Sequence, residues 1–180
     1  MTVDHMVVES LNRHLFPEEG MNVYAVLDAA SVPNLLLKIY DLEPEHVCLY
    51  RGELKPDMAE VAPYLIRLMP NSEFTKCVIG EGWGEHWGIF AISQADLHSL
   101  RNHFRRFLMV HDSDGKPLYF RYYDPRVLRV YLPICNDEEL KTVFGPVISY
   151  LVEDEDPKSG RKFVYIENIM REEKLTLGGG

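Results

Sequence analysis

The sequence has no apolar run long enough to cross a bilayer, which argues against an integral membrane protein. Its first ten residues, MTVDHMVVES, lack the basic-then-apolar order of a secretory signal peptide. Cysteine is scarce, and Cys48, Cys77 and Cys135 are widely spaced without the intervals typical of zinc ligands. We therefore expect a cytoplasmic protein whose cysteines are buried, reduced thiols.

Positive charge is also in short supply. The chain has 19 Lys and Arg against 28 Asp and Glu, a formal charge of −9, which argues against nucleic acid as the main partner. The charge is uneven. Basic residues gather in 101–129, whereas acidic residues gather at 18–19, 41–60, 137–139 and 153–156. A basic patch on an acidic protein can steer an acidic partner, and it can equally be a solvated face.

The sequence offers no recognisable catalytic constellation. Ser31, Ser72 and Ser93 stand in helix-cap positions, and no nucleophile-elbow pattern occurs. Of seven histidines, only His98 and His103 share a predicted helix, and five residues apart they do not share a face. We therefore expect no catalytic residue, no metal ligand and no cofactor.

What the sequence does contain is apolar residues in quantity. At 180 residues with 46% hydrophobic and 11% aromatic residues, the chain predicts one domain with a substantial core. Predicted strands and helices alternate, which favours an α/β single-domain sandwich with a mixed β-sheet flanked by helices. We divide the chain into an N-terminal helix (1–20), an α/β domain (21–152) and an acidic loop with a C-terminal extension (153–180).

Hydrophobic periodicity and cap residues place the individual elements. The predicted strands cover 22–28, 46–50, 64–69, 87–92, 108–111, 117–122, 147–152 and 163–169. The predicted helices cover 4–16, 33–42, 58–61, 73–80, 94–107, 125–132 and 136–145. Ser93 with Asp96, and Asn136 with Glu139, resemble capping boxes. The hairpin of 108–122 is expected to be antiparallel, after early parallel crossovers.

The stretch FRYYDPRVL (120–128) organises the rest of the prediction. Residues 118–123 alternate as in a strand, Asp124 stands at an N-cap position, and Pro125 stands at the first position of a helix. This abrupt strand-to-helix connection would hold Arg121, Asp124 and Arg126 close together. The first interpretation is a capping carboxylate stabilised by a neighbouring arginine.

A second interpretation concerns protein binding. Arg101 and Arg105 are one helical turn apart and face away from the apolar stripe of their helix. With the strand packed beside that helix, they would form a basic, aromatic-edged patch for acidic partner segments. The other members of this predicted patch are Arg121, Arg126 and Tyr119 or Tyr123. The alternative is that Arg121 and Arg126 are satisfied internally by Asp124 and other acids, and that Arg101 and Arg105 are merely solvated.

The stretch GEGWGEHWGIF (80–90) is unusual in composition. Its glycines, Gly80 to Gly84, resemble a phosphate-binding loop, which together with His86 suggests a small hydrolase or nucleotide-binding enzyme as an alternative function. No lysine follows, and a strand follows where a helix is needed, so we favour a tight helix-to-strand connection. Trp83 and Trp87 would lie in the core or, if exposed, would anchor an interface.

Six stretches together resemble the adaptor, or effector-chaperone, proteins of bacterial type VI secretion. They are YAVLDAA (24–30), CLYRGEL (48–54), APYLIRL (62–68), GWGEHWGIF (82–90), LRNHFRRFLMV (100–110) and FRYYDPRVLRVYLP (120–133). They occur in the family's order and span roughly 22–152. The combinations Trp-Gly-x-x-Trp-Gly and Tyr-Asp-Pro-Arg are the most specific.

The resemblance implies a non-enzymatic role. Such adaptors bind a toxic effector in the cytoplasm of the producing cell and load it onto the spike protein of valine-glycine repeats. It implies neither a nucleic acid nor a membrane partner, and it supplies no catalytic residue. Many members continue into a further helical region, whereas little of this chain remains after residue 152.

Overall fold

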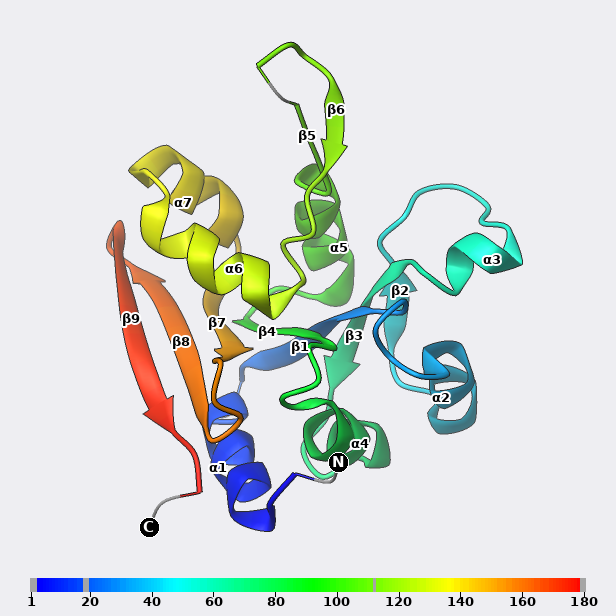
Figure 1. The fold of residues 1–180 in the computed structure, drawn as a ribbon, viewed down its shortest axis with the longest axis vertical. Helices are drawn as coiled ribbons and strands as arrows, with labels where there is room; N and C mark the ends of the chain where they lie inside the picture. Colours follow the sequence, from blue (N-terminus) through cyan, green and yellow to red (C-terminus); the bar gives the residue numbers. More distant parts are fainter. Residues whose placement is uncertain (1–2, 18–19, 112, 179–180) are drawn as a thin grey trace.

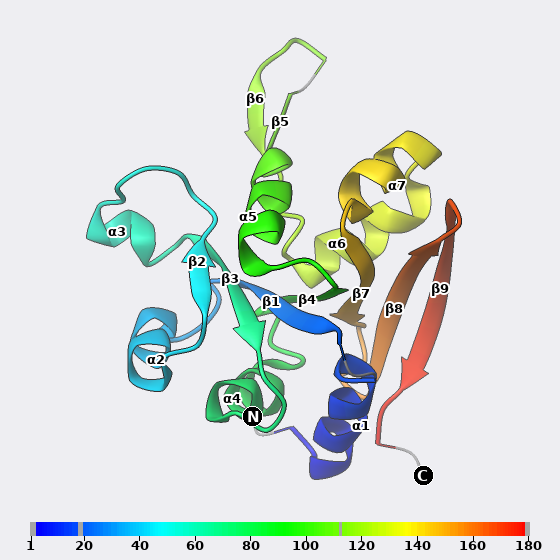
Figure 2. The same ribbon diagram turned by 180° about the vertical axis from the view of Figure 1, so that it is seen from behind.

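The computed structural model describes residues 3–17, 20–111 and 113–178. The acidic pair at 18–19 and Asp112 of the expected hairpin turn lie outside these residues. Figures 1 and 2 show a seven-stranded sheet with helices on both faces and a small hairpin that projects from one side. The predicted α/β class, with one sheet flanked by helices, is confirmed.

The elements follow the predicted order. The helices are α1 (His5–Leu15), α2 (Leu35–Leu42), α3 (Pro56–Ala59), α4 (Glu73–Gly82), α5 (Leu97–Arg106), α6 (Pro125–Tyr131), the 3₁₀ turn η1 (Leu132–Ile134) and α7 (Asp137–Phe144). The strands are β1 (Asn22–Asp28), β2 (His46–Cys48), β3 (Pro63–Leu68), β4 (Gly88–Ser93), β5 (Met109–His111), β6 (Pro117–Tyr119), β7 (Val147–Glu153), β8 (Ser159–Ile166) and β9 (Ile169–Thr176).

The main sheet has the order β2-β3-β1-β4-β7-β8-β9, and all of its pairings are antiparallel. The expectation of a mixed sheet with early parallel crossovers is therefore wrong. The helices that separate successive strands do not return the chain for parallel pairing. Each connection instead places the next strand antiparallel to its neighbour in the sheet. For example, β3 and β4 lie on either side of β1, and both run antiparallel to it.

The two faces of the sheet carry two apolar cores. Along β1, Val23, Ala25 and Leu27 face α1, α2 and α4, whereas Tyr24 and Val26 face α5, α6 and α7. This is the period-two alternation of a strand covered on both faces. Burial on both faces explains why β1 is apolar almost throughout. The strand lies in the middle of the molecule (Figure 1).

Two helix caps differ in how well the sequence specified them. Asn136 and Glu139 form the expected capping box of α7, with both reciprocal hydrogen bonds present. The box expected from Ser93 and Asp96 is wrong, because Asp96 is itself the N-cap of α5 and accepts from the Ser99 amide at 2.7 Å. The Ser93 hydroxyl instead donates to the carbonyl of Pro146 at 2.6 Å and so ties β4 to the start of β7.

Two segments depart from the predicted strands. The hairpin pairs only 109–111 with 117–119, because the chain turns after Tyr119 and the Asp124 amide donates to the Arg121 carbonyl at 3.0 Å. Residues 153–180, expected to form an acidic loop and an extension, contribute the hairpin of β8 and β9 to the edge of the sheet. The described part of the chain holds no helix long and apolar enough to cross a membrane.

His103 makes the stability of this fold dependent on pH. The ring is 6% exposed, packs against Phe107 and hydrogen bonds through Nε2 to the Val143 carbonyl at 2.9 Å. Burial lowers the pKa of His103 from 6.5 to about 4. The unfolded chain therefore binds the proton first, so the free energy of unfolding should fall by about 3 kcal/mol from this residue as pH drops from 6.5 to 4.

Denaturant unfolding of wild type and His103→Gln across this range measures that contribution. Glutamine keeps an N–H donor for Val143 but does not titrate. The variant should be less stable than wild type at pH 7, and the difference should shrink as the pH approaches 4. A difference that stays constant with pH would contradict a neutral, buried His103.

Candidate functional site

The strand-to-helix segment 120–126 lies at the end of the sheet where β1 and β7 finish and β4 begins. Asp28 is the last residue of β1 and Glu153 the last of β7, and the register places Leu27 opposite Gly88 at the start of β4. Arg121 of the segment pairs with Asp28 at one of these strand ends. The pKa of Arg126 is raised mainly by its hydrogen bond to Asp124 and further by the charge of Glu153 at the other.

Asp28 holds the first half of the segment. Its buried carboxylate accepts the Ala30 amide and the Ser31 hydroxyl, each at 3.1 Å, and forms an ion pair with Arg121. Burial opposes the charge of Arg121, but the Asp28 carboxylate outweighs it and raises the pKa of the guanidinium. The guanidinium also lies 5.9 Å from the centre of the Tyr123 ring. Arg121 is therefore fixed in place while half of its side chain stays exposed.

Asp124 holds the second half. It is the N-cap of α6, with Pro125 as the first helical residue, and it accepts the Arg126 amide at 2.9 Å. The Arg126 guanidinium donates to both carboxylate oxygens, at 3.0 and 2.7 Å. Burial opposes ionisation of Asp124, yet these hydrogen bonds lower its pKa. Asp124 is thus a capping carboxylate paired with a neighbouring arginine, as the first interpretation predicts. Both arginines are paired with acids, as the alternative to the binding patch predicts, although Arg121 uses Asp28 and not Asp124.

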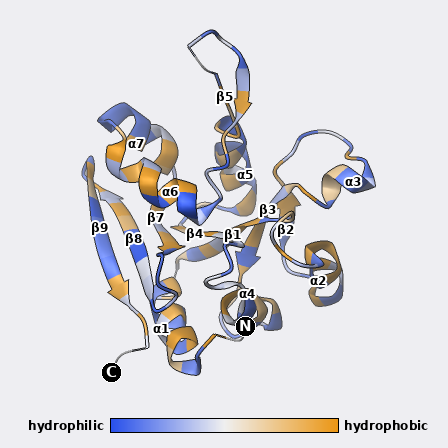
Figure 3. Cartoon of the chain, viewed as in Figure 1, coloured by the Kyte–Doolittle hydropathy of each residue, from blue (hydrophilic) through white to orange (hydrophobic). Residues whose placement is uncertain are grey.

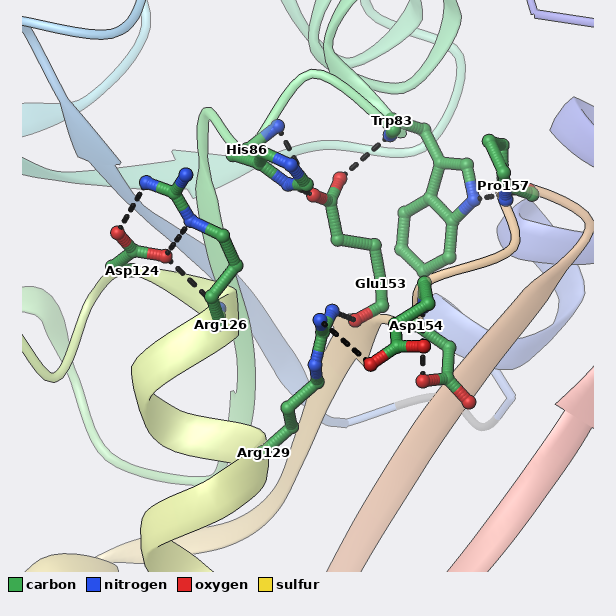
Figure 4. Close-up of polar contacts among 10 residues, drawn as sticks. Trp83, His86, Asp124, Arg126, Arg129, Glu153, Asp154 and Pro157 are labelled. Atoms are coloured by element: carbon green, nitrogen blue, oxygen red, sulfur yellow. Dashed lines mark hydrogen bonds and ion pairs between the residues drawn. The ribbon is translucent and has the colours of Figure 1, made fainter.

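A third buried acid, Glu153, fixes the loop that connects α4 to β4 (Figure 4). Its carboxylate accepts the Gly84 amide at 2.6 Å, the His86 amide at 3.0 Å and the His86 ring nitrogen Nδ1. Burial raises the pKa of Glu153, and His86 opposes that rise. Arg129 of α6 donates to the Glu153 backbone carbonyl at 3.3 Å, which joins the helix to the same point.

Trp83 and Trp87 are core residues, 3% and 7% exposed. The Trp83 indole donates to the Pro157 carbonyl at 2.8 Å and stacks on Phe90, and Lys38 lies 5.8 Å from the Trp87 ring. Both side chains are therefore too buried for the predicted role of interface anchors, which requires exposure. They belong to the packing of the 83–87 loop against the sheet.

The glycines of this stretch do not form a phosphate-binding loop. Gly80 and Gly82 lie inside the last turns of α4, where the free backbone groups are carbonyls and the helix dipole is negative. Gly84 has φ +85° and makes the turn into β4. Among the described residues, the hydrogen bonds of His86 all go to Glu153, and none reaches a hydroxyl or thiol that could act as a nucleophile.

Arg105 has a structural role that the sequence did not indicate. Its guanidinium donates to the backbone carbonyls of Cys48, Leu49 and Tyr50, at 2.8 to 3.0 Å. Burial, followed by the charge of Arg101, lowers the pKa of Arg105. Arg105 therefore makes internal contacts, which fit neither an outward-facing patch nor a merely solvated side chain. Arg101, one turn earlier, is partly exposed but has a buried Nε without a hydrogen-bond partner among the described residues.

Tyr50 connects the two groups of arginines. Its carbonyl is held by Arg105, its ring lies 6.0 Å from that of Tyr119, and it adjoins Tyr123, which contacts Arg121. The exposed members of this arrangement are Tyr119, Arg121 and Arg126, which we call the junction surface. The sequence analysis identified the segments that meet here but not the roles of Asp28, Tyr50 and Glu153. Asp28 and Glu153 each carry one signal, an acid as the last residue of an apolar strand, and Tyr50 carries none.

The described residues contain no group of three or more His, Cys, Asp or Glu side chains arranged to hold a metal ion. Cys48, Cys77 and Cys135 are free thiols, each partly buried. Burial raises the pKa of each thiol above its usual value, which lowers the fraction present as reactive thiolate.

Comparison with known proteins gives one match. A family model described as a domain of unknown function, DUF4123, matches residues 23–142. No curated protein and no solved structure matches the chain.

Two glycines of α4 offer a matched test of the packing at this site. A Cβ at Gly80 meets open space, whereas a Cβ at Gly82 would overlap the Trp87 ring. Gly80→Ala should therefore stabilise the fold by ~0.5–1 kcal/mol through helix propensity. Gly82→Ala should destabilise it by ~1–3 kcal/mol, since the buried indole has no room to move. Thermal unfolding of both variants measures this, and equal effects would contradict the described packing.

Asp124 combines a cap with an ion pair, and two substitutions separate them. Asp124→Ala should cost ~1 kcal/mol or more, because the Arg126 amide and guanidinium both lose their acceptor. Asp124→Asn should cost less, since asparagine is an equally good N-cap but carries no charge. Urea unfolding measures both. An alanine variant as stable as wild type would show that Asp124 does not anchor α6.

Proposed function

The chain belongs to the DUF4123 family, which is associated with effector adaptors of type VI secretion, and from this premise we propose that it is a non-enzymatic adaptor. In this proposal it binds a toxic effector in the cytoplasm of the producing cell. It then helps to load that effector onto the spike protein of valine-glycine repeats. Its partners are proteins, not nucleic acids or membranes.

One observation carries the proposal, namely the family match over 23–142. The matched residues include the 83–87 loop, the hairpin and the whole junction segment. They also include Asp28 and Tyr50, which hold the junction surface in place. All three members of the junction surface therefore lie within the residues that the family model matches.

The geometry of the junction surface supports a protein-binding role. Arg121 and Arg126 are each held by an acid that is nearly buried, and each keeps about half of its side chain exposed. Tyr119, at the base of the projecting hairpin, is 67% exposed. Arginine and tyrosine are enriched at protein interfaces. Arginine also forks to carboxylates, so the partner segment at this surface should be acidic.

The alternative of a hydrolase or nucleotide-binding enzyme has no structural observation in its favour. It relied on a glycine loop, of which Gly80 and Gly82 belong to α4 and Gly84 makes the turn into β4, and on His86, whose hydrogen-bond partner is Glu153. Tyr123 and Arg105, also predicted to bind partners, support the surface from beneath. Tyr123 is buried under Arg121, and Arg105 fixes Tyr50.

Removing two exposed side chains of the junction surface tests the proposal. Tyr119→Ala with Arg126→Ala removes the exposed ring and the guanidinium that pairs with Asp124, whereas Asp124 keeps the amide of residue 126 as its capping donor. Loss of the ion pair should lower the stability, so thermal unfolding first establishes that the double variant is folded at the assay temperature. The double variant should lose either the effector or the spike protein in affinity purification from cells that assemble the secretion system. Wild type should recover both.

Met6→Ala with Arg13→Ala is the matched control. It removes a comparable apolar area and one positive charge from exposed positions of α1, which covers the other face of the sheet. The control should retain both partners. Two results would count against the proposal: deletion of the whole chain without loss of effector export, or retention of both partners by the Tyr119 and Arg126 variant.

A further inference from the structure

The outer face of α2 is apolar although nothing in the described chain covers it. Leu35 and Ile39 fill the core beneath the helix, yet Leu37 is 57% and Tyr40 79% exposed on the opposite side. Figure 3 colours α2 as largely hydrophobic. Large apolar side chains that are exposed together on one helix face often mark an interaction site, so this face is expected to have a partner.

Grooves flank Tyr40 on both sides. The larger, about 720 Å³, runs along the 29–37 segment to Glu60 and Tyr40, and the smaller, about 480 Å³, runs between Tyr40 and Tyr64. Met58 of α3 and Val61 after it are also exposed, and they flank Glu60, which lines the larger groove. A ridge with a groove on each side is the shape onto which a second helix packs.

The margin of this face is acidic. Glu60 lines the larger groove, Glu43 lines the smaller one, and Asp41 follows Tyr40 in α2. All three are exposed, and none of them forms an ion pair with another described residue. Lys38 of the same helix is engaged with Glu81 at 2.9 Å, and Arg67 with Glu45 at 3.2 Å. The uncompensated charge at the margin is therefore negative, which complements a partner that carries Lys or Arg.

Other occupants fit this face less well. A second copy would set one acidic margin against another in a symmetric dimer, and an anionic membrane surface would repel it. Strand addition beside it is also disfavoured. The nearest sheet edge is β2, only 3 residues long, and Arg105 already holds the carbonyls of Cys48, Leu49 and Tyr50.

We propose that the α2 face, defined by Leu37, Tyr40, Met58 and Val61 with the acidic margin of Asp41, Glu43 and Glu60, docks a basic amphipathic helix of the effector. The inference rests on the proposed adaptor function. It adds a second surface of opposite character to the junction surface, which suits acidic segments. An adaptor that must hold two different proteins at once needs two such surfaces.

Two synthetic helices of ~18 residues, about five turns, are the probes. Both carry leucine along one face, and the other face is lysine in one peptide and glutamate in the second. The lysine peptide should bind the intact protein by fluorescence anisotropy, more weakly as salt rises, and the glutamate peptide should not. Equal binding of both peptides would overturn the charge assignment.

Two double variants locate the site. Leu37→Ser with Tyr40→Ser removes the apolar ridge, and Asp41→Lys with Glu60→Lys reverses the margin. Each should weaken binding of the lysine peptide about tenfold or more. Glu9→Lys with Glu173→Lys makes the same change of net charge on α1 and β9 and should leave the affinity unchanged. An equal loss in this control would mean non-specific attraction and would overturn the proposal.

Interbacterial competition separates failure of the docking site from failure of the proposed function. If the strain lacking the chain kills as well as wild type, the adaptor function fails. If that strain loses killing but the Leu37 and Tyr40 variant, with an unchanged melting temperature, restores it fully, only the docking site fails. A sedimentation shift showing dimers that the serine variant abolishes, or binding to anionic vesicles, would likewise overturn the assignment of a helix.

Discussion

The arrangement of the site depends on one buried carboxylate. Glu153 ends β7, a strand buried on both faces, and there it accepts two backbone amides of the 83–87 loop as well as the His86 ring. An ionised carboxylate inside a protein is costly unless it is hydrogen bonded, and these three donors meet that requirement. Because Arg129 donates to the carbonyl of the same residue, loop, strand and helix α6 are fixed at one point.

This point lies outside the residues that the family model matches. The match ends at residue 142, whereas β7 begins at Val147 and is the strand that pairs with β4. The 83–87 loop lies inside the match, but its acceptors, Glu153 and the Pro157 carbonyl, come from beyond it. The strands β7 to β9 therefore complete the matched region both by extending its sheet and by binding its most distinctive loop.

Local signals made much of the fold predictable. The bounds of β1 followed from a nearly unbroken apolar run, and the start of α7 followed from an Asn and a Glu three residues apart. Helix caps and hydrophobic periodicity depend on residues close in sequence, so they can be predicted from the sequence alone. The direction of strand pairing is decided by contacts between distant segments, which is why a mixed sheet was expected where an antiparallel one forms.

The β8–β9 hairpin was predicted as a single late strand for a related reason. Its outer strand, IMREEKLT, is mostly exposed and charged, so it shows no buried face for a pattern to reveal. Charged side chains on an edge strand discourage pairing with other chains. The same feature that protects the edge of the sheet thus hides the strand from an analysis of hydrophobic periodicity.

The sequence identified several residues of the candidate site but not the residues that they contact. Arg121 and Asp28 are 93 residues apart in sequence, and Arg105 reaches carbonyls 55 to 57 residues away. A backbone carbonyl carries no side-chain signature, so no sequence pattern could have shown that Arg105 is used internally. Trp83 and Trp87 illustrate the converse, because a residue type favoured at interfaces is favoured equally in cores.

The pairing of the junction arginines with acids does not remove them from binding. A guanidinium carries five N–H donors, and Arg126 gives its Nε and Nη2 to Asp124 while Arg121 gives Nη2 to Asp28. The remaining donors stay available on side chains that are about half exposed. An arginine already held in one conformation loses less entropy when a partner binds. An arginine that is paired with an internal acid can therefore still bind an acidic partner segment. The internal pair also fixes the conformation in which the arginine would bind.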